Sequence, residues 1–226
     1  LRQVPDCAPR STLDSLSRRS RVMPPGADLG PFVSGQKKVR PPDGPLTILW
    51  NHRWEDDKNP NDFFRLLFLL AEEGYPFRLS VVGETLRKWP PVFQQARKRL
   101  GNRMVQFGYL PKRDDYIETV RQADVVVSTA VREFFSLSVV EATAAGLYPL
   151  LPNRLSFPEI IQSRWHREFL YRDDRGLRSR LVRLLEGKVD WVPARQLSRQ
   201  IQACDWHNRI RKYDDALALV AQSSRV

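Results

Sequence analysis

Short apolar runs alternate with longer stretches of helical periodicity between residues 46 and 171. This alternation is typical of βαβ units, whose right-handed crossovers place helices on both faces of a parallel sheet. We therefore expect an α/β domain over residues 46–226 that ends in amphipathic helices. The expected strands are residues 46–50, 77–83, 103–108, 124–128, 147–151 and 168–171. The expected helices are residues 60–73, 91–100, 112–122, 137–145 and 157–162, with two or three more in residues 175–222.

Residues 1–45 have a different composition, which is rich in Pro, Ser, Arg and Gly. Such a composition predicts a connector with one short helix near residues 11–19 rather than a packed domain. The chain does not begin with Met. We expect residues 1–45 to be a connector, and the missing Met indicates a fragment.

The formal net charge is +11, from 37 Lys and Arg against 26 Asp and Glu. A surplus of this size favours a polyanionic partner, such as nucleic acid or an anionic membrane face, although a solvated arginine-rich surface explains it equally well. The two cysteines, Cys7 and Cys204, are far apart and form no disulfide framework, which fits a cytoplasmic protein. No apolar run approaches the roughly 20 residues of a membrane-spanning helix, so we expect no transmembrane segment.

Two cations, Arg53 and Lys58, follow the first expected strand. Ligands bind at the carboxyl ends of the strands in open parallel sheets, and a guanidinium with an ammonium there would suit a phosphate. The alternative is a solvent-exposed loop in which Lys58 pairs with Glu55 or Asp56. His52, next to Arg53, either contacts a ligand or has a packing role.

The stretch EFFSLSVVEATAAG, residues 133–146, places Glu141 within an apolar helical run and Glu133 eight positions earlier. Ser136 or Ser138 can cap this helix, and its first free N–H groups together with the helix dipole form a seat for an anion. The two glutamates would then accept hydrogen bonds from hydroxyl groups of a ligand, as a carboxylate does from ribose in dinucleotide folds. Alternatively, Glu141 is a structural carboxylate that a neighbouring backbone group satisfies.

Seven motifs occur in one order: PPGADLGPF, NHRWEDDKN, VVGE, FGYLP, ADVVVST, EFFSLSVVEATAAGLYPLL and FPEII. This order resembles the carboxyl-terminal, nucleotide-binding half of the retaining GT-B glycosyltransferases of family four, over about residues 20–220. Within that family, WNHRWEDDKNP and EFFSLSVVEA are similar to the queuosine-tRNA mannosyltransferases. The sequence departs from the family at Phe134 and Ser136, where glycines are usual, and at Ser156 and Phe157, which replace Gly-Gly.

The resemblance implies a Rossmann-like parallel sheet and transfer of a hexose with retention of configuration, from GDP-mannose to queuosine in tRNA. It implies catalytic roles for Arg53, Lys58 and Glu133, which would hold the diphosphate and the sugar. The implied donor-binding residues are His52, Gly83, Gly108, Tyr109, Leu110, Phe135, Ser136, Leu137, Ser138 and Glu141. It implies no metal cofactor, because two cations and a helix end would cover the diphosphate, and the sequence has no D-x-D motif.

The family pairs this half with an amino-terminal domain that carries most contacts to the acceptor. The resemblance thus implies that residues 1–45 are a connector and the remnant of a missing amino-terminal half, and we expect that domain as a partner. We expect weak donor binding and little or no transfer by these 226 residues alone. Two alternatives stay open: a family-four enzyme that acts on a polysaccharide or glycolipid, and a non-enzymatic basic module that binds nucleotide or RNA. Binding to tRNA and to liposomes, compared at two salt concentrations, would separate these acceptors.

Overall fold

One six-stranded parallel sheet forms the centre of the molecule, with the strand order β3-β2-β1-β4-β5-β6. The structure is a computed structural model that describes residues 10–34, 44–84 and 89–223. The order and the parallel direction confirm the expected Rossmann-like α/β fold. The strands are β1 (Leu46–Trp50), β2 (Phe77–Val82), β3 (Met104–Gly108), β4 (Val125–Val127), β5 (Tyr148–Pro152) and β6 (Leu170–Tyr171).

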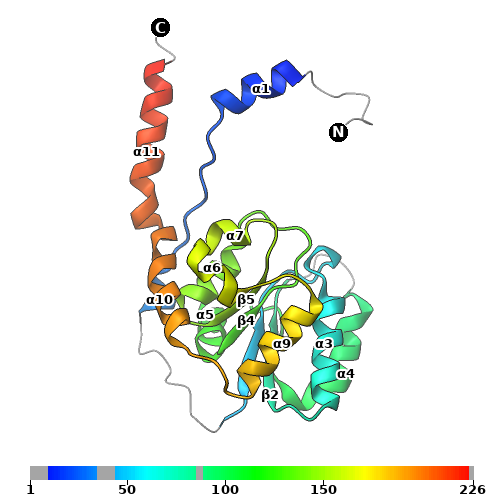
Figure 1. The fold of residues 1–226 in the computed structure, drawn as a ribbon. Coiled ribbons are helices and arrows are strands. Elements are labelled where there is room, and N and C mark those ends of the chain that lie inside the picture. Colours follow the sequence, from blue (N-terminus) through cyan, green and yellow to red (C-terminus); the bar gives the residue numbers. More distant parts are fainter. Residues whose placement is uncertain (1–9, 35–43, 85–88, 224–226) are drawn as a thin grey trace.

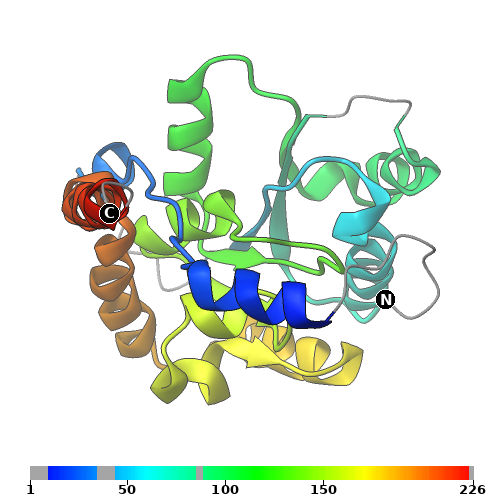
Figure 2. The same ribbon diagram turned by 90° about the horizontal axis from the view of Figure 1, so that it is seen from above.

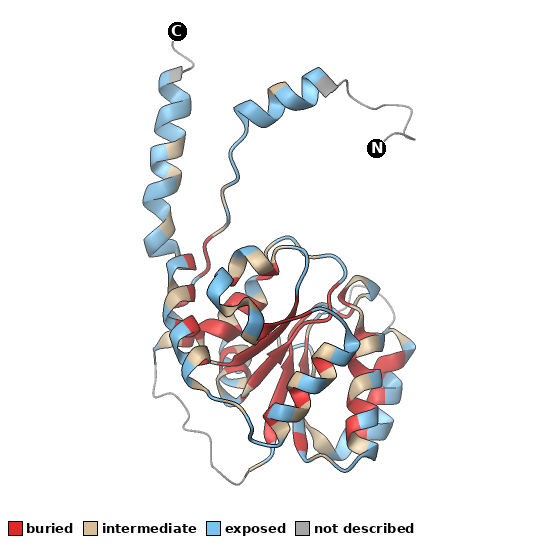
Figure 3. Cartoon of the chain, in the orientation of Figure 1, coloured by how far each residue is buried: buried red, intermediate tan, exposed pale blue. Residues whose placement is uncertain are grey.

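The central strands are almost entirely apolar, with Thr47 as an exception in β1, because helices cover both faces of the sheet. Every residue of β1, β4 and β5 is buried. Figure 3 shows these buried strands at the centre and the exposed outer faces of the helices around them. This burial explains why the strands read as continuous apolar runs rather than as alternating ones.

Two groups of helices enclose the sheet. Seen from above in Figure 2, one group lies on one side of the strands and the second group on the other. The first group is α3 (Pro60–Glu72), α4 (Pro91–Leu100) and α9 (Asp174–Leu185), and the second is α5 (Arg113–Gln122), α6 (Leu137–Ala144) and α10 (Val192–Ile201). Proline occupies the first turn of α3, and Gly74, with a φ of 84°, follows its end.

The element boundaries differ from the expected ones mainly in the part of the chain that follows β5. Strand β6 has two residues rather than four, because α8 (His166–Phe169) ends directly before it. The helix expected over residues 157–162 ends earlier, as α7 (Phe157–Ile160). Helix α2 (Gly30–Val33) and α8 were not expected, since a single turn has no periodicity to detect. Single 3₁₀ turns are η1 (Asp56–Lys58), η2 (Gly101–Arg103), η3 (Ser163–Trp165) and η4 (Gln202–Cys204).

The chain before the sheet is joined to the end of the chain. Ala27 forms a parallel bridge with Asp205, and the Leu29 amide donates to Asp205 Oδ2 over 3.0 Å. Leu29 and Phe32 are buried. The Pro- and Gly-rich composition did not predict that this segment would pack against the domain. Residues 1–9, with Cys7, and residues 35–43 lie outside the described residues, and the boundary at residue 46 stays a prediction.

Helices α1 (Arg10–Arg19) and α11 (Trp206–Ser223) project from the domain on one side, as Figure 1 shows. Both are mostly exposed. Apolar side chains lie on that exposed surface, among them Leu16 and Leu217. We therefore infer that α1 and α11 offer apolar surface that the domain itself does not cover.

Candidate functional site

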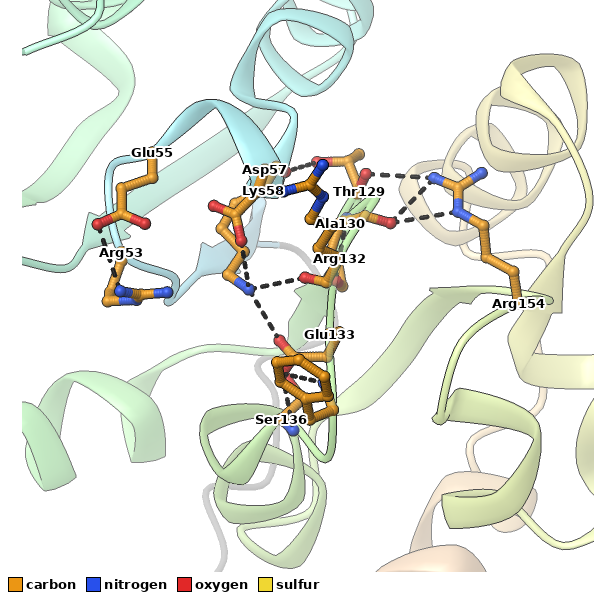
Figure 4. Close-up of polar contacts among 12 residues, drawn as sticks. Arg53, Glu55, Asp57, Lys58, Thr129, Ala130, Arg132, Glu133, Ser136 and Arg154 are labelled. Atoms are coloured by element: carbon orange, nitrogen blue, oxygen red, sulfur yellow. Dashed lines mark hydrogen bonds and ion pairs between the residues drawn. The ribbon is translucent and has the colours of Figure 1, made fainter. Parts of the chain in front are cut away.

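The loops that follow β1 and β4 meet at the centre of the sheet. Strands β1 and β4 are neighbours, although β2 and β3 lie between them in the sequence. The strand order therefore reverses at this point, and open α/β sheets bind ligands at such a switch point, outside the carboxyl ends of the strands. Figure 4 shows the two loops with Lys58 and Glu133 between them.

Lys58 and Glu133 are in direct contact. The Lys58 ammonium lies 3.3 Å from Glu133 Oε2 and 3.2 Å from Asp57 Oδ2, and it donates to the Arg132 carbonyl over 2.8 Å. The side chains of Lys58 and Glu133 are 9% and 13% exposed. Glu133 Oε1 also accepts the amides of Phe134 and Ser136. These hydrogen bonds offset the desolvation of a nearly buried ion pair.

Arg53 does not share this position. Its side chain is 54% exposed, and its Nη1 lies 3.3 Å from Glu55 Oε1. The two cations therefore form no joint clamp here: Lys58 points inward to Glu133, while Arg53 lies at the surface (Figure 4). The alternative pairing of Lys58 with Glu55 or Asp56 is wrong, because the acids beside Lys58 are Asp57 and Glu133.

His52 is buried beneath the same loops. Its ring packs edge-on against Trp50, with the ring centroids 5.1 Å apart, and its Nε2 has no hydrogen-bond partner among the described residues. Burial lowers the pKa of His52 to about 4, so the imidazole is neutral at physiological pH. A Cβ atom on Gly83 would lie 1.8 Å from the His52 carbonyl oxygen. Gly83 is thus required for close approach of two loops, whatever it contacts in a ligand.

The start of α6 is held differently from the expected cap. Ser136 occupies the N-cap position with a left-handed φ of 59°, and its buried hydroxyl has no partner among the described residues. Capping by the Ser136 side chain is therefore wrong, and Glu133 instead holds this turn through the Ser136 amide. Within the described chain, the amides of Leu137 and Ser138 have no acceptor. They lie at the positive end of the helix dipole, where an anion is favoured.

Glu141 is half-buried in the second turn of α6. Its Oε2 accepts the Tyr116 hydroxyl over 2.9 Å, and its Oε1 lies 3.8 Å from the Arg113 guanidinium. Burial raises the pKa of Glu141, while the Tyr116 hydrogen bond and Arg113 oppose that rise. The alternative of a backbone group as its partner is wrong, because a side-chain hydroxyl satisfies the carboxylate. Tyr116 was not expected, since nothing in the periodicity of α5 links it to α6.

A pocket of about 370 Å³ opens beside Glu141, at the carboxyl ends of β1, β2 and β3. Six of the predicted residues line it: His52, Arg53, Gly83, Tyr109, Leu110 and Ser138. Asn51, Arg113 and Tyr116 line it too, without having been predicted individually. Gly108 does not line the pocket but directly precedes Tyr109 in the chain, and its φ is 120°. Phe135 instead lines a second pocket, of about 430 Å³, beside α10 and the start of α11.

Comparison with known proteins identifies the family to which the chain belongs. Residues 35–175, more than half of the chain, match the family model described as "Glycosyl transferases group 1". The chain belongs to this family. The group 1 match covers the sheet from β1 to β6 and therefore includes both glutamates, both loop cations and the pocket.

A curated relative of this group 1 chain is the tRNA-queuosine alpha-mannosyltransferase of Drosophila melanogaster, which is 37% identical over 136 residues. The match covers 60% of this chain but only 35% of the relative, so the chain spans about a third of the relative's length.

Two solved structures share the fold of this chain. Sucrose-phosphate synthase from Thermosynechococcus elongatus matches 94% of this chain and 57% of its own, with a TM-score of 0.71 and 18% identity. Anabaena Alr3699/HepE, solved with UDP, matches 85% of this chain and 56% of its own, with a TM-score of 0.69 and 16% identity. At such identities the likeness shows the GT-B fold alone.

Neither membrane insertion nor a metal finds direct support in the described part of the chain. No helix among residues 10–34, 44–84 and 89–223 is long and apolar enough to cross a membrane. In the same residues, no three or more His, Cys, Asp or Glu side chains group as metal ligands would. A metal-independent reaction stays a prediction.

Proposed function

We propose that this chain is the donor-binding half of a retaining mannosyltransferase that takes mannose from GDP-mannose and modifies queuosine in tRNA. The observation that carries the proposal is the 37% identity to a tRNA-queuosine alpha-mannosyltransferase over 136 residues. The net charge of +11 suits an RNA acceptor. On this proposal, the rest of the enzyme supplies an acceptor-binding domain.

The donor would lie across the switch point between β1 and β4. The open amides of Leu137 and Ser138 would bind the diphosphate, with Arg53 closing over it from the surface. Fixed donors aimed at the leaving oxygens stabilise the charge that develops there, and loss of one typically costs about 10²- to 10³-fold in rate. The base would lie in the pocket beside Tyr109 and Leu110.

Lys58 and Glu133 would change partners when the donor binds. Their side chains are 3.3 Å apart and almost closed to solvent. A sugar hydroxyl that donates to Glu133 would replace part of the Lys58 contact, and the ammonium would then be available to the leaving diphosphate.

Thermal stabilisation by a panel of nucleotide sugars tests this function. A ligand that binds only the folded chain stabilises it by RT ln(1 + [L]/Kd), so millimolar concentrations reveal even weak binding. We expect GDP-mannose to raise the melting temperature more than UDP-glucose or ADP-glucose does. UDP-sugars are the main competitors, because UDP accompanies structural neighbours such as Anabaena Alr3699/HepE. A larger rise with a UDP-sugar would reject the guanosine donor.

The acceptor is tested separately with matched RNAs. We expect this chain to bind tRNA with an affinity that falls steeply between about 50 and 200 mM salt. Anionic liposomes should bind less at equal phosphate concentration. Transfer of mannose is expected only when an acceptor-binding domain is present, and turnover at enzyme-like rates by the 226 residues alone would contradict this division of labour.

A further inference from the structure

Three side chains from three different elements, of which Asn51 is buried and the other two are half-buried, form one chain of hydrogen bonds beside the pocket. Asn51 follows β1, Tyr116 lies in α5 and Glu141 lies in α6. Asn51 Nδ2 lies 2.9 Å from the Ser138 carbonyl and 3.1 Å from the Tyr116 hydroxyl oxygen. The Tyr116 oxygen lies 2.9 Å from Glu141 Oε2. No role for Tyr116 or Asn51 follows from the sequence motifs.

The chemistry of these groups fixes the direction of every hydrogen bond. The Ser138 carbonyl can only accept, so the Asn51 atom beside it must be the amide nitrogen. That nitrogen can only donate, so it gives its second hydrogen to the Tyr116 oxygen. The single Tyr116 proton is then directed to Glu141 Oε2, which accepts it as a carboxylate.

This order leaves one carboxylate oxygen of Glu141 for a ligand. Tyr116 engages Oε2, whereas the nearest charged group to Oε1 is Arg113, at 3.8 Å, beyond hydrogen-bond distance. The Glu141 side chain is 14% exposed, and Arg113, Tyr116 and Ser138 line the adjoining pocket. Asn51 Oδ1, which is buried, has no partner among the described residues. A hydroxyl-bearing ligand in the pocket would therefore meet an oriented acceptor.

We propose that Asn51 and Tyr116 are positioning residues that hold Glu141 with Oε1 free to accept a ribose hydroxyl of the donor nucleotide. The inference rests on the proposed function, because it requires a nucleotide in this pocket. It adds a structural connection between the protein groups that would bind the diphosphate and those that would bind the ribose. The Asn51 amide holds both the Ser138 carbonyl, in the helix turn expected to bind diphosphate, and the hydroxyl that holds the ribose acid.

The substitution Tyr116→Phe removes the hydroxyl and keeps the ring. The probes are GDP and UDP, each compared with its 2′,3′-dideoxy analogue by calorimetry on the full 226-residue chain. We expect the unchanged chain to bind the ribonucleotide about tenfold more tightly than the dideoxy analogue, the usual range for a hydrogen bond to a charged group. In Tyr116→Phe this preference should fall to about twofold or less, while dideoxy binding changes by less than about twofold.

The matched control is Tyr75→Phe. Tyr75 also donates to a glutamate, Glu186 Oε1 at 3.4 Å, but at the exposed surface and away from the pocket. It should leave the ribose preference unchanged. A second variant, Glu141→Gln, removes the acceptor charge, and in that background Tyr116→Phe should cause no further loss of preference, because the two residues act through one contact.

The pH dependence separates positioning from simple packing. Protonation of Glu141 removes the acceptor, so the ribose preference should vanish as the pH falls through the Glu141 pKa. The groups that face Glu141 are Tyr116 and Arg113 of α5 and Asp28, ahead of α2. Because the Tyr116 hydrogen bond opposes the rise in that pKa, Tyr116→Phe should move the titration midpoint of the Glu141 carboxyl, followed by NMR without nucleotide, to higher pH.

Each outcome has one meaning. Equal weakening of ribo- and dideoxynucleotides by Tyr116→Phe, or an unchanged preference, would overturn the positioning role and leave the proposed function standing. If the unchanged chain binds neither GDP nor UDP, both this inference and the nucleotide-sugar function fail together. A lost preference with an unshifted pH midpoint would also count against the proposal.

Discussion

Two pockets of similar size differ in how their polar groups are satisfied. The groove between α3 and α9 has a volume of about 420 Å³, and the pocket at the carboxyl ends of the strands about 370 Å³. In the groove, Arg65 contacts Asp62 and Asp174, and Arg99 contacts Glu72, all at the exposed surface. These cations are already balanced by acids, and exposed pairs of this kind contribute little stability.

The carboxyl edge shows the opposite pattern. Asn51 Oδ1, His52 Nε2 and Ser136 Oγ are buried without a hydrogen-bond partner among the described residues. Buried polar groups are nearly always satisfied, so each exception requires an explanation. Volume therefore does not distinguish the two pockets, whereas buried polar atoms without a hydrogen-bond partner among the described residues do. The following variants test that difference.

The largest expected effect is at Gly83. Its Cβ would lie 1.8 Å from a backbone oxygen, which cannot turn away as a side chain can. We expect Gly83→Ala to lower the free energy of unfolding by more than about 3 kcal/mol, measured by urea denaturation. Gly101→Ala, where nothing lies within 4 Å of the new Cβ, should change it by less than about 1 kcal/mol. Similar values for the two variants would contradict the close approach.

Lys58→Met compares the buried ion pair with the surface ones. The substitution keeps the length of the side chain but leaves Glu133 with only backbone donors, at 13% exposure. We expect a loss of about 3 kcal/mol in unfolding free energy. Arg65→Met in the α3–α9 groove should cost less than about 1 kcal/mol. Equal losses would mean that the two regions do not differ in burial of charge.

The pH dependence of stability should carry a contribution from His52. Its folded pKa is about 4, below the unfolded value of about 6.5, so the unfolded chain binds more protons between these values. Stability contributed by the neutral imidazole is present above pH 6.5 and is lost as the pH falls toward 4, with a slope approaching about 1.4 kcal/mol per pH unit. His52→Asn should flatten the curve in this window, whereas the exposed His207→Asn should not. Parallel curves for all three chains would exclude a buried neutral imidazole.

The smallest expected effect is an increase in stability when Ser136 is replaced by glycine. Its φ of 59° and its unpartnered hydroxyl both disfavour serine, and glycine relieves both. Ser136→Gly should raise the free energy of unfolding by about 1 kcal/mol, as measured by the thermal midpoint. The same change at Ser179, in the middle of α9, should lower it by about 1 kcal/mol. A loss at both positions would show that Ser136 is not strained.

The sequence predicts the sheet well because its central strands β1, β4 and β5 are buried on both faces and its crossovers are long. Continuous apolar runs identify β1, β2 and β5 within a residue or two. The candidate site is predicted less completely. Arg53 and Lys58 occupy one short loop, but the sequence does not say that one faces solvent and the other a glutamate 75 positions away. The contact of Tyr116 with Glu141 cannot be predicted from the sequence, because only the packing of α5 against α6 brings the Tyr116 hydroxyl to Glu141.

The bridge between Ala27 and Asp205 has a mechanical consequence. Further bonds run alongside it, from the Trp206 amide to the Ala27 carbonyl and from the Tyr213 hydroxyl to the Met23 carbonyl. The entering and leaving segments are thus fastened together where they part from the sheet. We expect this pairing to restrict the motion of α1 and α11 relative to the sheet to rotation about one axis. A single connecting segment would allow rotation about several axes.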